Sequence, residues 1–195
     1  MARYPRHAGS RAWLPGGRWG RLTDLDVSGL ERAVTDSPGT VTRFLEVLTG
    51  EVLVADVVRQ YPVTLGPDNE LGTTDGGVAT RRVAVLKGRT TNRAYVYAET
   101  IFVPEWLPEA AGVQLEETSD PIGRILTTHG LHPTRESLPQ SEGADARPPT
   151  AGVSLDSDVV WSRAYRLRIE GLPVFAIHEW FLHSVLDALD QRRRD

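Results

Sequence analysis

Four runs of apolar and β-branched residues, arranged as two closely spaced pairs, limit this chain to a fold built on antiparallel strands. The first pair covers residues 79–87 and 94–103, with Gly88 and Asn92 in the connection. The second pair covers residues 159–169 and 174–182, with Gly171 in the connection. Parallel strands need a crossover of about a dozen residues or more, so connections this short join antiparallel neighbours. The sequence therefore predicts two β-hairpins, and residues 52–63 predict a further strand.

Helical periodicity surrounds these strands. The spacing of apolar residues predicts helices over 26–35, 40–49 and 122–128, and a C-terminal helix that begins near Ser184. Thr40 stands at an N-cap position, Gly50 at the stop of the same helix, and Pro121 in the first turn of the helix over 122–128. Pro104 ends the predicted strand over 94–103. Helices before, between and after hairpins predict an α+β fold: one domain with a mainly antiparallel sheet and helices packed on it.

Composition predicts one domain with two looser segments. The length of 195 residues suits a single domain with a substantial core. Residues 1–21 contain five arginines, four glycines and no acid, which predicts a flexible basic arm. We expect the domain to cover 22–195, with a loose surface loop over 132–152, where proline, serine and glycine are frequent.

Several classes of protein are excluded by composition. The absence of cysteine excludes disulfide scaffolds, thiolate metal sites and cysteine nucleophiles. The net charge of −4 gives no overall attraction to nucleic acid or anionic lipid, and no apolar run approaches the ~20 residues of a membrane helix. The five histidines are scattered and predict no metal site. We expect a cytoplasmic protein without nucleic-acid or membrane partners.

Glu179 stands out because it lies in a nearly continuous apolar strand. Strand alternation places it on one face with Phe175 and Phe181 and places His178 on the other, so one of the two polar residues points into apolar surroundings. An unpaired charge there costs several kcal/mol. Two interpretations remain open on pattern alone: Glu179 faces a functional pocket, or it faces outward or pairs with a structural arginine.

The adjacent residues Arg81 and Arg82 pose a similar choice. Alternation places one of them on an apolar face of the strand over 79–87, where a guanidinium needs an anionic partner and can hold a carboxylate through two parallel hydrogen bonds. The alternative is that both side chains extend to water at the strand end.

Four segments, in order and at fitting spacing, carry a family resemblance. They are the helix at 39–45, the arginine-bearing strand at 82–89 with 97–100, the Pro-Ile-Gly turn at 120–126, and the closing strand pair at 163–182. Together they resemble the chorismate pyruvate-lyase family, including its actinobacterial branch that makes 4-hydroxybenzoate. Position 41 is Val where some members have Met.

The resemblance implies a function and a site. The implied reaction eliminates pyruvate from chorismate to give 4-hydroxybenzoate, without a metal or organic cofactor. Arg82 would line the pocket and anchor the ring carboxylate, and main-chain groups at Val41 and Ile122 would complete that anion site. Glu179 would face the same pocket at the ring hydroxyl, either orienting it or serving as acid or base. The implied partners are chorismate and an aromatic acid product, and no oligomeric state is implied.

Two alternative functions remain at this level. One is a non-catalytic ligand-binding module, since the same fold resembles the ligand-sensing domains of GntR-type transcription regulators. Against it, residues 1–38 are too short and too rich in glycine and proline for a winged-helix DNA reader. The other is a chorismate-converting enzyme with a different product.

Overall fold

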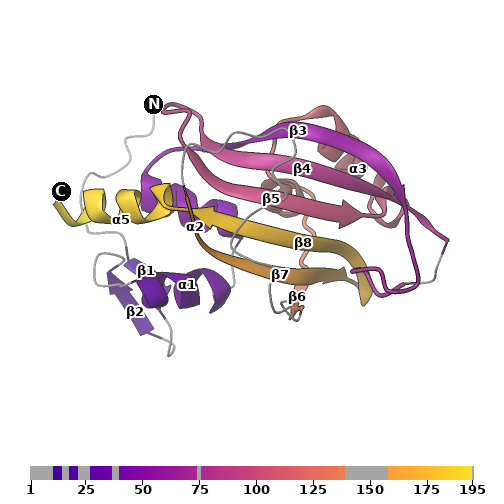
Figure 1. The fold of residues 1–195 in the computed structure, drawn as a ribbon, viewed down its shortest axis with the longest axis horizontal. Helices are drawn as coiled ribbons and strands as arrows, with labels where there is room; N and C mark the ends of the chain where they lie inside the picture. Colours follow the sequence, from indigo (N-terminus) through magenta and orange to yellow (C-terminus); the bar gives the residue numbers. More distant parts are fainter. Residues whose placement is uncertain are drawn as a thin grey trace.

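A six-stranded antiparallel sheet forms the centre of the structure, a computed structural model that describes residues 11–14, 18–21, 27–36, 40–73, 76–138 and 158–194. The strand order is β3-β4-β5-β8-β7-β6 (Figure 1). The strands are β3 (Leu53–Thr64), β4 (Val78–Gly88), β5 (Ala94–Phe102), β6 (Thr134–Ser137), β7 (Val159–Ile169) and β8 (Leu172–Leu182).

Both predicted hairpins are confirmed. Strands β4 and β5 pair through a turn in which Asn92 has a φ of 56°, and β7 and β8 pair through a turn in which Glu170 and Gly171 have φ values of 51° and 85°. These left-handed conformations suit Asn and Gly. The pairing of β5 with β8 joins the two hairpins into one continuous sheet.

The helices pack around this sheet. They are α1 (Val27–Asp36), α2 (Val41–Thr49), the 3-10 turn η2 (Pro104–Trp106), α3 (Glu109–Glu117), α4 (Ile122–Thr128) and α5 (Ser184–Arg194). Thr40 caps α2 as predicted, because its hydroxyl accepts a hydrogen bond from the backbone N–H of Arg43 at 3.2 Å. None of the helices among the described residues has the length and apolarity that crossing a bilayer demands.

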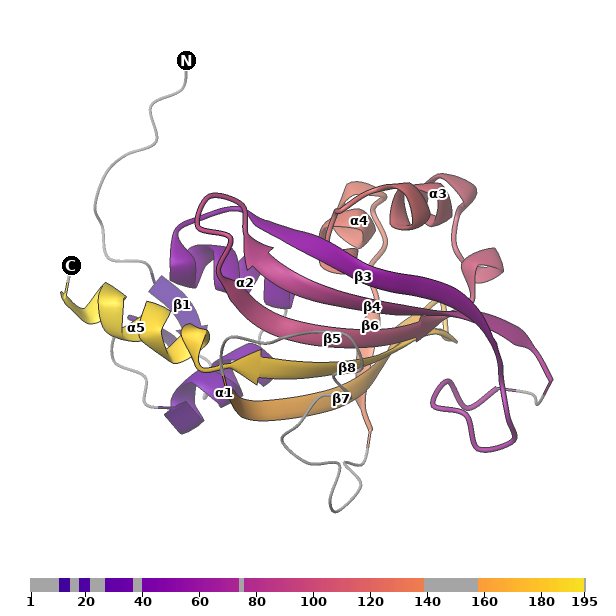
Figure 2. The ribbon, with the colours of Figure 1, turned by 45° about the horizontal axis from the view of Figure 1, so that its top comes forward.

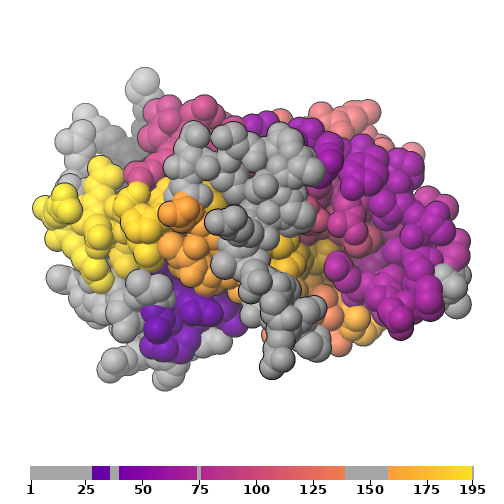
Figure 3. All heavy atoms as spheres, in the orientation of Figure 1, coloured from indigo at the N-terminus to yellow at the C-terminus, as the bar shows by residue number. Residues whose placement is uncertain are grey.

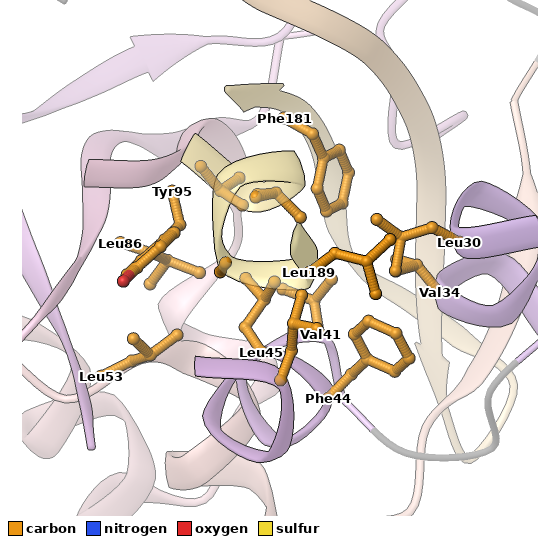
Figure 4. Close-up of a cluster of buried hydrophobic side chains, with 14 of the residues drawn as sticks. Leu30, Val34, Val41, Phe44, Leu45, Leu53, Leu86, Tyr95, Phe181 and Leu189 are labelled. Atoms are coloured by element: carbon orange, nitrogen blue, oxygen red, sulfur yellow. The ribbon is translucent and has the colours of Figure 1, made fainter. Parts of the chain in front are cut away.

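Two hydrophobic clusters hold the helices against the sheet, one toward each end of the strands. The first gathers side chains from α1, α2 and α5 against β4, β5 and β8, including Leu30, Leu45, Phe181 and Leu189 (Figure 4). The second packs α3 and α4 against the far ends of β5, β7 and β8, around Phe175. Figure 2 shows α2, α3 and α4 along the sheet, and Figure 3 shows α5 and the far end of β3 at opposite ends of the molecule's long axis.

The structure differs from the sequence expectations in three places. Arg11–Leu14 (β1) and Arg18–Arg21 (β2) pair as a hairpin inside the segment expected to be a flexible arm. Residues 134–137 of the expected loop form β6, which pairs with the edge of β7. The α3 helix falls where no element is predicted. Within these two segments, residues 1–10, 15–17 and 139–152 lie outside the described residues.

Candidate active site

A cavity of about 510 Å³ lies between the sheet and the N-terminal ends of α2 and α4. Its floor consists of two neighbouring rows of side chains that cross the sheet between the two hydrophobic clusters. The register defines them: the alanine row is Ala84, Ala98, Glu179 and Arg163, and the arginine row is Arg82, Thr100, Ile177 and Tyr165. All of these residues except Arg163 line the cavity. The rows on either side are filled by Leu86, Val96, Phe181 and Trp161, and by Phe102, Phe175 and Leu167.

Small side chains create the space. Ala84 and Ala98 are cross-strand partners on β4 and β5, and they line the cavity directly beside Glu179. Thr100 continues this stretch in the arginine row. Because the neighbouring rows carry Leu and Phe, the cavity forms where the sheet's side chains become short. The apolar surface of such a floor suits a flat ring, and the charged groups stand at its margins.

Arg82 is a buried cation in the cavity wall, with only 2% of its surface exposed. Its guanidinium donates hydrogen bonds to the carbonyl of Leu115, to Thr118 O at 3.4 Å and to Gln60 Oε1 at 3.3 Å. The two carbonyls come from the C-terminal end of α3, where the helix dipole favours a cation. None of the described carboxylates forms an ion pair with Arg82. Burial lowers the pKa of Arg82, yet arginine stays charged at neutral pH, so this wall of the cavity attracts anions.

Arg81 occupies the opposite face of β4. Its guanidinium pairs with Glu99 on β5, with Nη1 2.9 Å from Oε2. The interpretation in which both side chains extend to water is therefore wrong: Arg81 is partly exposed and paired with Glu99, and Arg82 is buried and lines the cavity.

Glu179 is a buried acid held by two donors. Arg163 Nε donates to its Oε2 at 2.7 Å, and the Tyr165 hydroxyl donates to its Oε1 at 3.1 Å. Arg163 is fixed in turn by a 2.9 Å hydrogen bond to the carbonyl of Val34 in α1. Burial and then the Glu179 charge raise the pKa of Tyr165, so the phenol keeps its proton and remains a donor. Burial alone lowers the pKa of Arg163, but Glu179 and Tyr165 more than offset it, and the net shift is upward.

Two helix N-termini form the roof and meet each other. A Cβ added to Gly123 in α4 would lie 2.5 Å from the Cβ of Thr40, the α2 cap, so only glycine fits at this contact. Arg124 joins the helices further: its guanidinium donates to Glu46 in α2 at 2.5 Å and to the carbonyl of Leu53 at 3.0 Å. The contact brings Val41 and Ile122, the first residues of α2 and α4, to the cavity.

The structure thus brings all four residues singled out from the sequence to one cavity: Arg82, Glu179, Val41 and Ile122. The two interpretations of Glu179 are both realised, because it faces the cavity and also pairs with an arginine. About 12 Å separates the Cα atoms of Arg82 and Glu179, as two strand spacings and a shift of two residues give. That span leaves room for one six-membered ring between the two side chains.

Two residues of the site were not found from the sequence. The sequence does contain a signal for Arg163: it shares the period-two alternation of β7 with Trp161 and Tyr165, which places it on the buried face of the strand. Arg163 does not line the cavity itself but holds Glu179, which does. Arg135 lines the cavity from β6, and the sequence gives no signal for it, because its segment is predicted to be a loop.

Comparisons with known proteins identify the family of the chain. The family model described as "Chorismate pyruvate-lyase Rv2949c-like" matches residues 35–189. The chain is 26% identical over 172 residues to a chorismate pyruvate-lyase of Mycobacterium tuberculosis strain H37Rv, covering 84% of this chain and 86% of that protein. It is 30% identical over 172 residues to one of Mycobacterium leprae, covering 84% and 79%.

Solved structures support the fold alone. PhnF from Mycobacterium smegmatis superposes with a TM-score of 0.50 at 13% identity, covering 75% of this chain and 64% of that one, so the match leaves about a third of PhnF unmatched. Its separate effector domain gives a TM-score of 0.50 at 12% identity, covering 76% and 91%.

Proposed function

The chain belongs to the Rv2949c-like chorismate pyruvate-lyase family, and from this premise we propose that it eliminates pyruvate from chorismate to give 4-hydroxybenzoate. The observation that supports this most directly is that two buried charged residues line one cavity with a floor of alanines: Glu179, and Arg82, which has no carboxylate partner among the described residues. Such a cavity suits a flat ring with an anion at one end and a hydroxyl at the other.

Arg82 would bind the ring carboxylate. Its guanidinium is already positioned by Gln60 and by carbonyls at the end of α3, so little ordering of the side chain remains when the ligand arrives. Backbone N–H groups at Val41 and Ile122 would complete this anion site from the roof, where the α2 terminus adds its dipole. The ring would then lie on Ala84 and Ala98.

Glu179 would accept the hydrogen bond of the ring hydroxyl. Both of its oxygens already accept from neighbours, Arg163 and Tyr165, and a carboxylate has about four acceptor positions. We assign it the orienting role, because an acid held by two fixed donors holds the hydroxyl-bearing carbon in one place.

The reaction balances without an added reagent. The ring carbon that bears the hydroxyl loses its hydrogen as a proton, and the neighbouring carbon–oxygen bond of the ether breaks. The ring becomes aromatic, and the enolpyruvyl group takes a proton on its methylene carbon to become pyruvate. The side chains of the cavity supply orientation, since aromatisation provides much of the driving force.

The test is incubation of the purified protein with chorismate, with pyruvate and 4-hydroxybenzoate both measured. Arg82→Gln should lower kcat/KM by about 10²-fold or more, because it removes charge-assisted hydrogen bonds worth about 1.5–3 kcal/mol each. Arg81→Gln is the matched control, since Arg81 is the next residue on the opposite face and pairs with Glu99; we expect its kcat/KM to stay near that of the wild type.

Three outcomes would contradict the proposal. Ligand binding without pyruvate release would favour a sensor module, and a different aromatic product would point to other chorismate chemistry. Equal losses in Arg82→Gln and Arg81→Gln would remove Arg82 from the site.

A further inference from the structure

Arg135 is a second cation of the cavity without a carboxylate partner among the described residues. Its guanidinium carbon lies 4.9 Å from the ring centroid of Tyr165, and its Nη1 donates to the carbonyl of Thr35 at 3.2 Å. Its Nε is buried and has no hydrogen-bond partner in the part of the chain that the structure describes. The adjacent Glu136 does not neutralise it, because Glu136 pairs with Arg166 and Arg168.

The two uncompensated arginines stand at opposite flanks of the cavity. Arg82 is on β4 and Arg135 on β6, four strands apart in the sheet, which corresponds to about 19 Å between the strands. Glu179 lies between them on β8. Tyr165 connects Glu179 with Arg135, because its hydroxyl donates a hydrogen bond to Glu179 while its ring lies under the Arg135 guanidinium. Arg135 is therefore next to the end of the cavity that Glu179 defines.

We propose that Arg135 binds the second carboxylate of the substrate, the one on the enolpyruvyl group, and thereby positions the ether for elimination. This rests on the proposed function. With the ring carboxylate at Arg82 and the hydroxyl at Glu179, the ether carbon is the ring carbon adjacent to the hydroxyl. The enolpyruvyl group then extends along the Glu179 side of the cavity, toward Tyr165 and Arg135. A buried donor without a partner gains a hydrogen bond there, and a cation gains its anion.

The proposal makes the cavity selective for a dianion. The aromatic product carries one carboxylate, which Arg82 would hold, so Arg135 should contribute to the binding of chorismate and not of 4-hydroxybenzoate. The two ligands therefore separate a role in positioning the enolpyruvyl group from a general role in holding the fold.

The experiment uses Arg135→Gln and Arg135→Lys. For Arg135→Gln we expect the KM for chorismate to rise about 10- to 100-fold, while the affinity for 4-hydroxybenzoate, measured by calorimetry, stays within about twofold of the wild type. Arg135→Lys keeps the charge and should recover part of the loss. The matched control is Arg168→Gln, in the same strand pair, where Arg168 bonds to Glu136 at 2.7 Å and does not line the cavity.

The outcomes distinguish this proposal from the function on which it rests. An unchanged KM in Arg135→Gln, with an active wild type, overturns the role of Arg135 alone. A loss of 4-hydroxybenzoate affinity as large as the loss for chorismate also overturns it, because a structural role then suffices. A wild type that releases no pyruvate overturns both.

Discussion

Gly123→Ala should separate the two helices that roof the cavity. The added Cβ would lie 2.5 Å from Cβ and 2.7 Å from Cγ2 of Thr40, whereas carbon atoms pack at about 3.5–4.0 Å. The helices α2 and α4 must therefore part by about 1 Å at their N-termini. Overpacking of this kind costs about 1–3 kcal/mol, or roughly 3–10 °C in Tm for a chain of this size.

The same shift should be visible in catalysis. It moves the backbone at Val41 and Ile122 away from the ligand, and a misplacement of about 1 Å can cost on the order of 100-fold in rate. We therefore expect kcat/KM with chorismate to fall about 10- to 100-fold in Gly123→Ala. Thermal unfolding and steady-state kinetics measure the two effects independently.

Two further variants make the test specific to the contact. Thr40→Gly removes the atoms that the new methyl group would strike, and glycine caps helices only a few tenths of a kcal/mol less well than threonine, so the double variant should recover most of the stability and activity. Gly112→Ala in α3 is the control, because its Cβ would meet nothing closer than 3.9 Å, and it should stabilise by about 0.5–1 kcal/mol. An unchanged Tm in Gly123→Ala, or no recovery in the double variant, would refute the reasoning.

Three further predictions follow from the site and its surroundings. Glu179→Ala should lower the free energy of unfolding by about 3–5 kcal/mol, because Arg163 is left buried and unpaired; denaturant unfolding should show the double variant with Arg163→Met losing less than Glu179→Ala alone. Glu51→Gln should cost about 1 kcal/mol at pH 7, because it weakens the acceptors for Thr91 and Tyr95. Burial raises the pKa of Glu51 but these hydrogen bonds lower it more, so its pKa in the folded protein lies below the usual 4.5. The stabilisation that ionised Glu51 provides is therefore present above pH 4.5 and is lost as the pH falls through the lower folded pKa. Melting curves of the wild type and Glu51→Gln should converge in acid. Ala98→Leu should fill the floor beside Glu179 and weaken 4-hydroxybenzoate binding more than about tenfold while the protein stays folded, which calorimetry and circular dichroism can check.

Local pattern was enough to predict most of the sheet. Strands with strict alternation, such as β7, and helices with clear caps, such as α2, were predicted within a residue or two. The α3 helix was missed because Gly112 interrupts it and prolines precede it, so propensity and periodicity both weaken there. The short strand β6 is formed by pairing with the edge of β7, a distant partner that local pattern does not reveal.

The sequence predicted part of the site's residues and none of their pairings. Pattern alone marked Glu179 and the pair Arg81 and Arg82, since a charged residue there shares a strand face with apolar ones, and left their roles open. The family resemblance chose Arg82 and added Val41 and Ile122. That Glu179 faces Arg163 depends on the register between β7 and β8, and that Arg82 is held by the end of α3 depends on contacts 33 and 36 residues away in the chain. These long-range contacts depend on the register of the assembled sheet, which the residues next to Glu179 and Arg82 in the sequence do not predict.

The small side chains of Ala84 and Ala98 should make the melting temperature of this protein depend on whether a ligand is bound. Interior positions of a covered sheet usually carry large branched side chains, so the unliganded fold has less packing here than its backbone would allow. A ring that settles on these alanines supplies the missing contacts, and its stabilising effect grows as RT ln(1 + [L]/Kd). A rise in melting temperature therefore reports how much of the floor is occupied. We therefore expect variants that enlarge Ala84 or Ala98 to make the unliganded protein more stable and to lower its turnover of chorismate.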